Sequence, residues 1–286
     1  METKSIPCRF QILGSDGEEI QMQYLIPMEI KFPFPTIIVH GFKGFMDWGH
    51  FPWVADAISK RGHVVIMFNF SHDGTAKESP SEFTRLDLFA KNTYSRELFD
   101  LDKVIREVCD SKQFKDLKLD TSKVNLVGHS RGGGMCILKT AEDNRINRLV
   151  TWAAMDSCGS FFGRDEDLLR QWKLDGVSYI YNSRTKQQMP LHYTLYEDSL
   201  IHAARLNIPN AAQKIQIPWL IIHGEQDPTI PVEVAYRFKD LNPQAQLFIM
   251  KGAHHNFGGK HPLDKTADYA QIELLTQLTA DFLEKD

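Results

Sequence analysis

The residues in this sequence best suited to do chemistry are a serine and the glycines around it. Ser130 lies at the centre of Gly128-His129-Ser130-Arg131-Gly132, a Gly-x-Ser-x-Gly pattern. A β-rich apolar run at 123–127 precedes the pattern, and a segment with helical periodicity at 135–141 follows it. A serine on a tight strand-to-helix turn projects its hydroxyl above a sheet, and its flanking positions must be small. The pattern therefore predicts a nucleophilic serine at position 130.

A serine hydroxyl is a weak nucleophile, so a histidine must accept its proton as it attacks. For a serine on this kind of turn, the expected chain order is serine, acid, histidine. His254, His255 and His261 follow the last predicted strand. We take His255 as the base, with His254 as the alternative. His261 stands beside Pro262 and is interpreted as structural.

The histidine needs a carboxylate that orients its ring and stabilises the imidazolium. Asp227 fits best, because it follows the apolar run at 219–223 within Gly-Glu-Gln-Asp-Pro. Glu225, in the same turn, and Asp156, at the end of the preceding predicted strand, are the competitors. Asp227 therefore completes the predicted catalytic triad.

The developing oxyanion needs two backbone N–H donors held in place. One is expected from Arg131, directly after the nucleophile, and the other from Phe42 in the turn His40-Gly41-Phe42. Gly41 permits the backbone bend, and we expect Gly41 and Phe42 to border the substrate. The ring of His40 is expected to hydrogen-bond within the turn.

Eight apolar or alternating runs predict the strands that position these residues: 8–13, 20–26, 34–39, 64–70, 123–127, 148–154, 219–223 and 246–250. The first two runs flank a Gly-Ser-Asp-Gly turn and are typical of a hairpin. Helical periodicity occurs at 50–60, 93–108, 232–241 and 266–283. Strands that alternate with helices predict an α/β fold with a doubly wound, mostly parallel, eight-stranded sheet.

Residues 156–216 interrupt this alternation. The segment has no buried strand and is rich in aromatics: Phe161, Phe162, Trp172, Tyr179, Tyr181, Tyr193 and Tyr196. A small hairpin is predicted around Asn182-Ser183-Arg184. Loops that follow strand carboxyl ends lie above the ligand crevice of such sheets. We therefore expect a cap over the site, inserted in a single domain that spans 1–286. The alternative is a surface subdomain that packs its own aromatics.

Composition is ordinary for a water-soluble protein, with 42% hydrophobic and 24% charged residues in a chain of 286. A net charge of −4 gives no reason to expect nucleic acid or an anionic membrane as a partner. No apolar run approaches the roughly 18–20 residues of a membrane span. Residues 1–7 lack an apolar signal core, so a cytoplasmic location is expected. The four cysteines show no paired or metal-like spacing.

These motifs resemble those of the α/β-hydrolase family in order and spacing, over nearly the whole chain. The matching segments are His-Gly-Phe (40–42), Gly-His-Ser-Arg-Gly (128–132), His-Gly-Glu-Gln-Asp-Pro (223–228) and Gly-Ala-His-His-Asn-Phe (252–257). The sequence is most similar to the cinnamoyl/feruloyl esterase-like branch, close to dienelactone-hydrolase-like and serine-peptidase relatives. The resemblance implies an α/β-hydrolase fold, His255 as the base, Phe42 and Arg131 as oxyanion donors, and the insertion as a small lid.

Some features depart from relatives or exclude other chemistries. Residues 69–74 read Asn-Phe-Ser-His-Asp-Gly where relatives often carry Asp-Phe-x-Gly-x-Gly, so a different pocket wall is expected. Ser130 stands where haloalkane dehalogenases and epoxide hydrolases have aspartate. The adjacent His254 and His255 lack metal-ligand spacing. No Gly-x-Gly-x-x-Gly follows an early strand. Neither a metal nor a cofactor is therefore expected.

The sequence thus predicts a cofactor-free serine hydrolase, a carboxylesterase that acts on a small-molecule ester through an acyl-enzyme on Ser130. A short-to-medium acyl chain or an aryl acid would lie under the aromatic cap. A peptidase, amidase or thioesterase is the first alternative, because ester and peptide cleavage share a tetrahedral intermediate. A non-catalytic small-molecule binder is the second alternative. The oligomeric state is not predicted.

Overall fold

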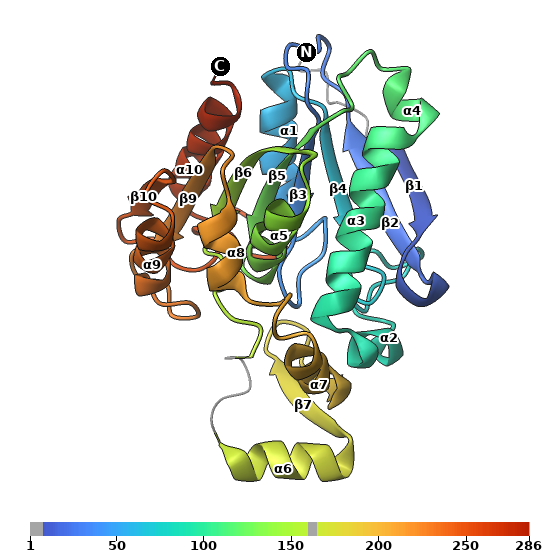
Figure 1. Ribbon diagram of the computed structural model, residues 1–286. Coiled ribbons are helices and arrows are strands. Elements are labelled where there is room, and N and C mark those ends of the chain that lie inside the picture. The colour runs from blue at the N-terminus through green and yellow to red at the C-terminus, as the bar shows by residue number, and fades with distance from the viewer. Residues whose placement is uncertain (1–7, 160–164, 286) are drawn as a thin grey trace.

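The computed structural model describes residues 8–159 and 165–285, and an eight-stranded sheet forms its centre (Figure 1). Its strands are β1 (Cys8–Leu13), β2 (Glu19–Leu25), β3 (Thr36–Val39), β4 (Val65–Asn69), β5 (Val124–His129), β6 (Ile146–Trp152), β9 (Trp219–Gly224) and β10 (Gln246–Met250). They lie in the order β1-β2-β4-β3-β5-β6-β9-β10. Pairing is antiparallel as far as β4 and parallel beyond it. The predicted eight-stranded, mostly parallel sheet is confirmed.

The central strands are mostly apolar because helices cover both of their faces. Every residue of β4 and β9 is buried. Parallel pairing brings the carboxyl ends of neighbouring strands to one edge, where Val39 pairs with Gly128 and His129 pairs with Trp152. The loops that leave this edge carry the candidate site residues.

Helices pack on both faces of the sheet, as in a doubly wound fold. They are α1 (Phe51–Lys60), α2 (Leu86–Lys91), α3 (Tyr94–Asp110), α4 (Lys112–Lys115), α5 (Arg131–Glu142), α6 (Glu166–Asp175), α7 (Thr194–Ile201), α8 (Ile208–Lys214), α9 (Glu233–Leu241) and α10 (Tyr269–Leu283). Helices α1 and α10 share a core with Trp152 on one face. Helices α3, α5, α8 and α9 share a second core with Leu126 on the other (Figure 1).

Side-chain caps account for where two predicted helices begin. The Thr93 hydroxyl accepts a hydrogen bond from the N–H of Arg96, at 3.2 Å, so α3 begins just after Thr93. The Asp268 carboxylate accepts from the N–H of Gln271, at 3.3 Å, so α10 begins after residue 268 rather than at 266. Helices α2 and α4 and the 3₁₀ turn η1 (Ser15–Gly17) are too short for periodicity to predict.

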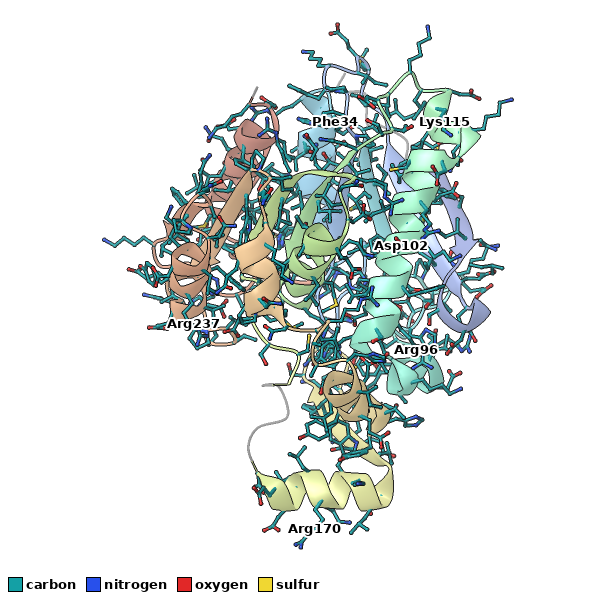
Figure 2. The ribbon with its side chains drawn as sticks, viewed as in Figure 1. Phe34, Arg96, Asp102, Lys115, Arg170 and Arg237 are labelled. Atoms are coloured by element: carbon teal, nitrogen blue, oxygen red, sulfur yellow. The ribbon has the colours of Figure 1, made fainter. Side chains whose placement is uncertain are left out.

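The segment between β6 and β9 extends beyond the carboxyl edge of the sheet (Figure 1). It contains the predicted hairpin, formed by β7 (Val177–Asn182) and β8 (Gln187–His192). Arg170, on α6, points away from the sheet (Figure 2). Helix α8, in contrast, packs against α5 in the body. The cap role of residues 156–216 stays a prediction.

Three sets of residues named above lie outside the described part of the chain: residues 1–7, Phe161 and Phe162. Within 8–159 and 165–285, no helix is both long and apolar enough to cross a membrane.

Candidate active site

Ser130 occupies a strained turn between β5 and α5. Its backbone φ of 56° lies in the left-handed region, which a non-glycine residue adopts only when its surroundings hold it there. Its N–H donates to the carbonyl of Trp152 at 2.8 Å, and its own carbonyl accepts from Gly134 and Met155, each at 3.1 Å. A Cβ on Gly128 would come within 2.7 Å of the Cys136 sulfur. The glycine therefore allows α5 to pack closely behind the serine.

The structure brings Ser130, His255 and Asp227 into one hydrogen-bonded chain. The Ser130 Oγ donates to Nε2 of His255 at 3.0 Å, and Nδ1 of His255 donates to Oδ2 of Asp227 at 2.7 Å. The His255 side chain is 13% exposed, whereas that of Asp227 is fully buried. An imidazole held in this way can accept the serine proton from one side while the carboxylate stabilises its positive charge from the other.

The loop after β9 holds the Asp227 carboxylate in place. Oδ1 of Asp227 accepts from the N–H groups of Thr229 and Ile230, at 2.8 and 2.9 Å. Nε2 of His223 donates to the Ile230 carbonyl at 2.9 Å and lies 3.4 Å from Oδ2 of Asp227. Burial acts to raise the pKa of Asp227, but the hydrogen bonds from His255 and the loop outweigh it and lower that pKa. Asp227 is therefore ionised at neutral pH.

The competing histidines and acids have other partners. Nδ1 of His254 donates to the Gln226 carbonyl at 2.8 Å. Glu225 accepts from the N–H of Gly252 at 2.9 Å. Neither contact involves Ser130.

Two further candidates make structural contacts. Asp156 pairs with Arg237 at 2.5 Å. His261 accepts from the N–H of Gly49 at 2.9 Å, in keeping with its interpretation as structural. Asp227 is thus the acid that contacts His255.

The predicted oxyanion turn lies directly beside the serine. A Cβ on Gly41 would come within 2.9 Å of the Ser130 Cβ, so the bare glycine backbone is needed at this approach. Beneath it, the buried Arg131 guanidinium pairs with Glu97 at 3.3 Å and lies over the rings of Phe42 and Tyr94. The backbone N–H groups of Phe42 and Arg131 remain the predicted oxyanion donors.

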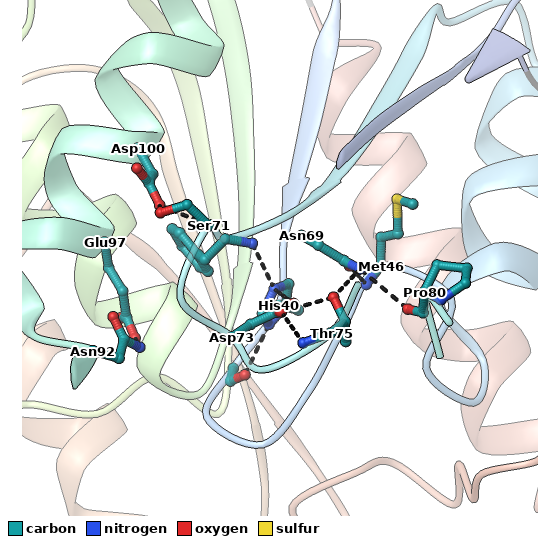
Figure 3. Close-up of polar contacts among 12 residues, drawn as sticks. His40, Met46, Asn69, Ser71, Asp73, Thr75, Pro80, Asn92, Glu97 and Asp100 are labelled. Atoms are coloured by element: carbon teal, nitrogen blue, oxygen red, sulfur yellow. Dashed lines mark hydrogen bonds and ion pairs between the residues drawn. The ribbon is translucent and has the colours of Figure 1, made fainter. Parts of the chain in front are cut away.

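A buried polar network supports the turn from behind (Figure 3). Nδ1 of His40 donates to the Gly41 carbonyl at 2.9 Å, as expected for a ring bonded within its own turn. Oδ2 of Asp73 lies 3.5 Å from Nε2 of His40, and Oδ1 accepts from the N–H and hydroxyl of Thr75, each at 2.8 Å. Burial raises the pKa of Asp73 to about 7 and lowers that of His40 to about 4. His40 is therefore neutral at neutral pH.

Further hydrogen bonds extend the network. The Ser71 hydroxyl donates to Asp100 at 2.7 Å, and Asn69 donates to Thr75 at 2.8 Å. Residues 69–74, expected at the pocket wall, contribute to this network and are not among the described residues that line the cavity.

A cavity of about 770 Å³ opens above Ser130 and His255. Gly41 and Phe42 border it, as expected for positions next to the substrate. The insertion contributes the hairpin turn at 182–184. Lys43, Trp48, Met155 and Ile230 also line the cavity. The sequence alone did not indicate this, because these residues lie near motifs without carrying one themselves.

Comparisons with known proteins concern the family and the fold. The profile of the family described as "Alpha/beta hydrolase family" matches residues 37–269. The chain is 24% identical over 264 residues to "Uncharacterized peptidase YuxL" of Bacillus subtilis (strain 168), covering 89% of this chain. It spans only about a third, 36%, of that relative's length.

A second curated relative is matched over most of its length. The chain is 24% identical over 256 residues to the 2-hydroxy-6-oxo-6-(2'-aminophenyl)hexa-2,4-dienoic acid hydrolase of Metapseudomonas resinovorans, covering 80% of each. Among solved structures, that of Est1E from Butyrivibrio proteoclasticus with bound ferulic acid superposes with a TM-score of 0.70 and 20% identity. It covers 96% of this chain and 97% of Est1E. At that identity the likeness establishes the fold.

Proposed function

The chain belongs to the alpha/beta hydrolase family, and we propose that it is a serine hydrolase that cleaves carboxylic esters through an acyl-enzyme on Ser130. The observation that carries this proposal is the hydrogen-bonded chain from Ser130 through His255 to Asp227, at 3.0 and 2.7 Å. Nucleophile, base and orienting acid thus stand within the reach that general-base catalysis requires.

In the first half of the reaction, Ser130 Oγ attacks the ester carbonyl carbon while His255 Nε2 takes the hydroxyl proton. The carbonyl oxygen becomes an oxyanion, for which the N–H groups of Phe42 and Arg131 are the proposed donors. The bond to the alcohol oxygen then breaks, and the imidazolium returns its proton to that oxygen. An alcohol leaves, and the acyl group remains on Ser130.

In the second half, a water molecule attacks the acyl carbon as His255 takes one of its protons. The tetrahedral intermediate collapses, the bond to Ser130 Oγ breaks, and the proton passes to the serine. The carboxylic acid is released and the enzyme is regenerated. Asp227 stays ionised throughout, which fits its lowered pKa.

The cavity supports a substrate of modest size. Its volume of about 770 Å³ and its aromatic lining by Phe42, Trp48 and Phe51 suit a short-to-medium acyl chain or an aryl acid. The Est1E structure with bound ferulic acid, an aryl acid, shows that a related fold accommodates such a group.

A peptidase or thioesterase on the same residues is the second candidate. The similarity to a protein described as a peptidase favours it, although the chain spans 36% of that protein. A panel of para-nitrophenyl esters, thioesters and aminoacyl amides distinguishes the classes. We expect the highest kcat/KM on esters; a preference for the amides would reassign the enzyme to the peptidases.

The decisive experiment labels the folded protein with a fluorophosphonate and measures ester turnover. We expect one covalent adduct, on Ser130, and loss of both labelling and turnover in Ser130→Ala. Ser183→Ala, which removes another hydroxyl of the same cavity, should keep the label. A folded wild-type protein that takes no label and turns over no ester would instead be the non-catalytic binder.

A further inference from the structure

The cavity above Ser130 carries an uneven charge. Two extended cationic side chains, Lys43 and Arg184, line it in addition to Arg131 and the histidines. None of the described residues that line it is an aspartate or a glutamate. This contrasts with a chain whose net charge is −4. A cavity lined by one sign of charge concentrates ligands of the opposite sign.

Lys43 follows the proposed oxyanion donor Phe42 directly. Its side chain makes no ion pair with any carboxylate in the described part of the chain. Partial burial lowers the pKa of its ammonium group, because the charge has lost water without gaining a partner. A bound anion at this position would compensate the ammonium group for the water it has lost.

Arg184 reaches the same cavity from the turn between β7 and β8. The N–H of Arg184 donates to the Asn182 side chain at 3.1 Å, which holds the turn. Its guanidinium lies 5.5 Å from the ring centroids of both Phe45 and Phe83. Lys43 and Arg184 thus line the same cavity from two different loops.

Arg184 also has no ion-pair partner among residues 8–159 and 165–285. Glu82 acts on it electrostatically without reaching ion-pair distance, and burial lowers the pKa of the guanidinium. The third cation of the cavity differs, because Arg131 is neutralised by Glu97 at 3.3 Å. Elsewhere the buried Lys139 pairs with Glu142 at 2.7 Å. Of the lysine and arginine side chains that line the cavity, Lys43 and Arg184 are therefore the two without a carboxylate partner.

We propose that Lys43 and Arg184 form an anion-binding subsite, and that the enzyme prefers esters that carry a negatively charged group away from the scissile bond. This inference rests on the proposed esterase function and names its substrate class. The aromatic platform under Arg184 positions the guanidinium without neutralising it. A carboxylate is the natural probe, because a guanidinium can bind it through two parallel hydrogen bonds.

The test compares matched charged and neutral esters in two arms. In the acyl arm, mono-para-nitrophenyl glutarate is compared with para-nitrophenyl pentanoate. In the alcohol arm, para-acetoxybenzoate is compared with its methyl ester. The measured quantity is the ratio of kcat/KM for the charged ester to that for the neutral one. We expect a ratio above one in at least one arm, falling as sodium chloride is added, because salt screens the attraction.

Variants assign the effect to the two cations. Arg184→Gln and Lys43→Gln should each lower the charged-to-neutral ratio by about tenfold, the size of one charge-assisted hydrogen bond. Lys186→Gln is the matched control: it removes a cation from the same turn that does not line the cavity, so the ratio should not change. Taking a ratio cancels any general effect of a variant on folding or on the serine.

The outcomes separate the two proposals. If neutral esters are hydrolysed in a Ser130-dependent way but the ratio is one or less in both arms, the anion subsite is wrong and the esterase stands. The same holds if the ratio survives in Arg184→Gln and Lys43→Gln. If no ester in either arm is hydrolysed and Ser130 takes no fluorophosphonate, the proposed function itself fails.

Discussion

The guanidinium carbon of Arg131 lies 3.9 Å from the ring centroid of Phe42. These are the two residues whose backbone N–H groups we propose as oxyanion donors. They lie about 90 residues apart in sequence, one in the turn after β3 and one at the start of α5. Glu97, on α3, holds the guanidinium in this place through a buried ion pair of 3.3 Å. The contact between the two side chains thus helps to set the spacing of the two backbone segments.

We predict that Glu97→Gln destabilises the protein and slows turnover. The change leaves a buried guanidinium without its counter-charge, which typically costs about 3 kcal/mol. Chemical denaturation measures the free energy of unfolding, and ester hydrolysis measures kcat. Asp110→Asn, an exposed change on the same helix, is the control and should alter neither. A Glu97→Gln protein as stable as wild type would mean that the ion pair is not needed to hold Arg131.

We predict that Asp227→Asn lowers kcat by about 10⁴-fold, as expected when the imidazole loses its orienting carboxylate and takes the wrong tautomer. The fold should be retained, because an asparagine oxygen can still accept from the N–H groups of Thr229 and Ile230. Steady-state ester hydrolysis is the measurement. His254→Ala, which removes the neighbouring ring, should stay within about threefold of wild type. A collapse of activity in His254→Ala would transfer the role of base to that residue.

We predict that Gly132→Ala destabilises the turn that carries the nucleophile. A Cβ there would lie 2.6 Å from the Val39 carbonyl oxygen and still closer to that of His40, and neither backbone can move freely. Overpacking of this kind typically costs about 2 kcal/mol. The midpoint temperature of thermal unfolding and the rate of ester turnover should both fall. Gly159→Ala is the control, because no atom of the described residues lies within 4 Å of its added methyl group. Equal behaviour of the two variants would show that the helix can shift to accept a methyl group.

We predict that Asp73→Asn stabilises the protein at alkaline pH. The native carboxyl keeps its proton up to a pKa of about 7, whereas the unfolded chain releases it near the usual aspartate pKa of 3.8. The native state therefore binds more protons in this window. The stability contributed by Asp73 is complete below the unfolded pKa and is lost as pH rises through 7. Asparagine mimics the protonated form and removes this dependence.

Denaturation at about pH 5 and about pH 8 tests this expectation: the advantage of Asp73→Asn should grow by about 3 kcal/mol between them. The exposed Asp87→Asn should show no such growth. An advantage that is constant with pH would mean that Asp73 is already ionised in the native state near pH 5.

Much of the fold was predictable because its signals are local. Each central strand is a short apolar run, and helices cover both faces of the sheet, so alternation alone indicated the doubly wound architecture. The turn at Ser130 was also predictable, since its Gly-x-Ser-x-Gly pattern lies within five residues of chain. The order serine, acid, histidine narrowed the base to neighbouring residues. Chain order alone did not separate His254 from His255, and the choice of His255 also drew on the family resemblance.

Only the tertiary structure made the choices that depend on long-range contact. In the folded chain His255 hydrogen-bonds to Ser130 and Asp227, whereas His254 hydrogen-bonds to a backbone carbonyl. Folding buried Arg131 against Glu97, 34 positions away, and brought Arg184 and Lys43 to the same cavity. Sequence spacing measures distance along the chain, whereas ion pairing and cavity lining depend on distance through space. The packing of the loops at the carboxyl edge of the sheet decides these distances through space.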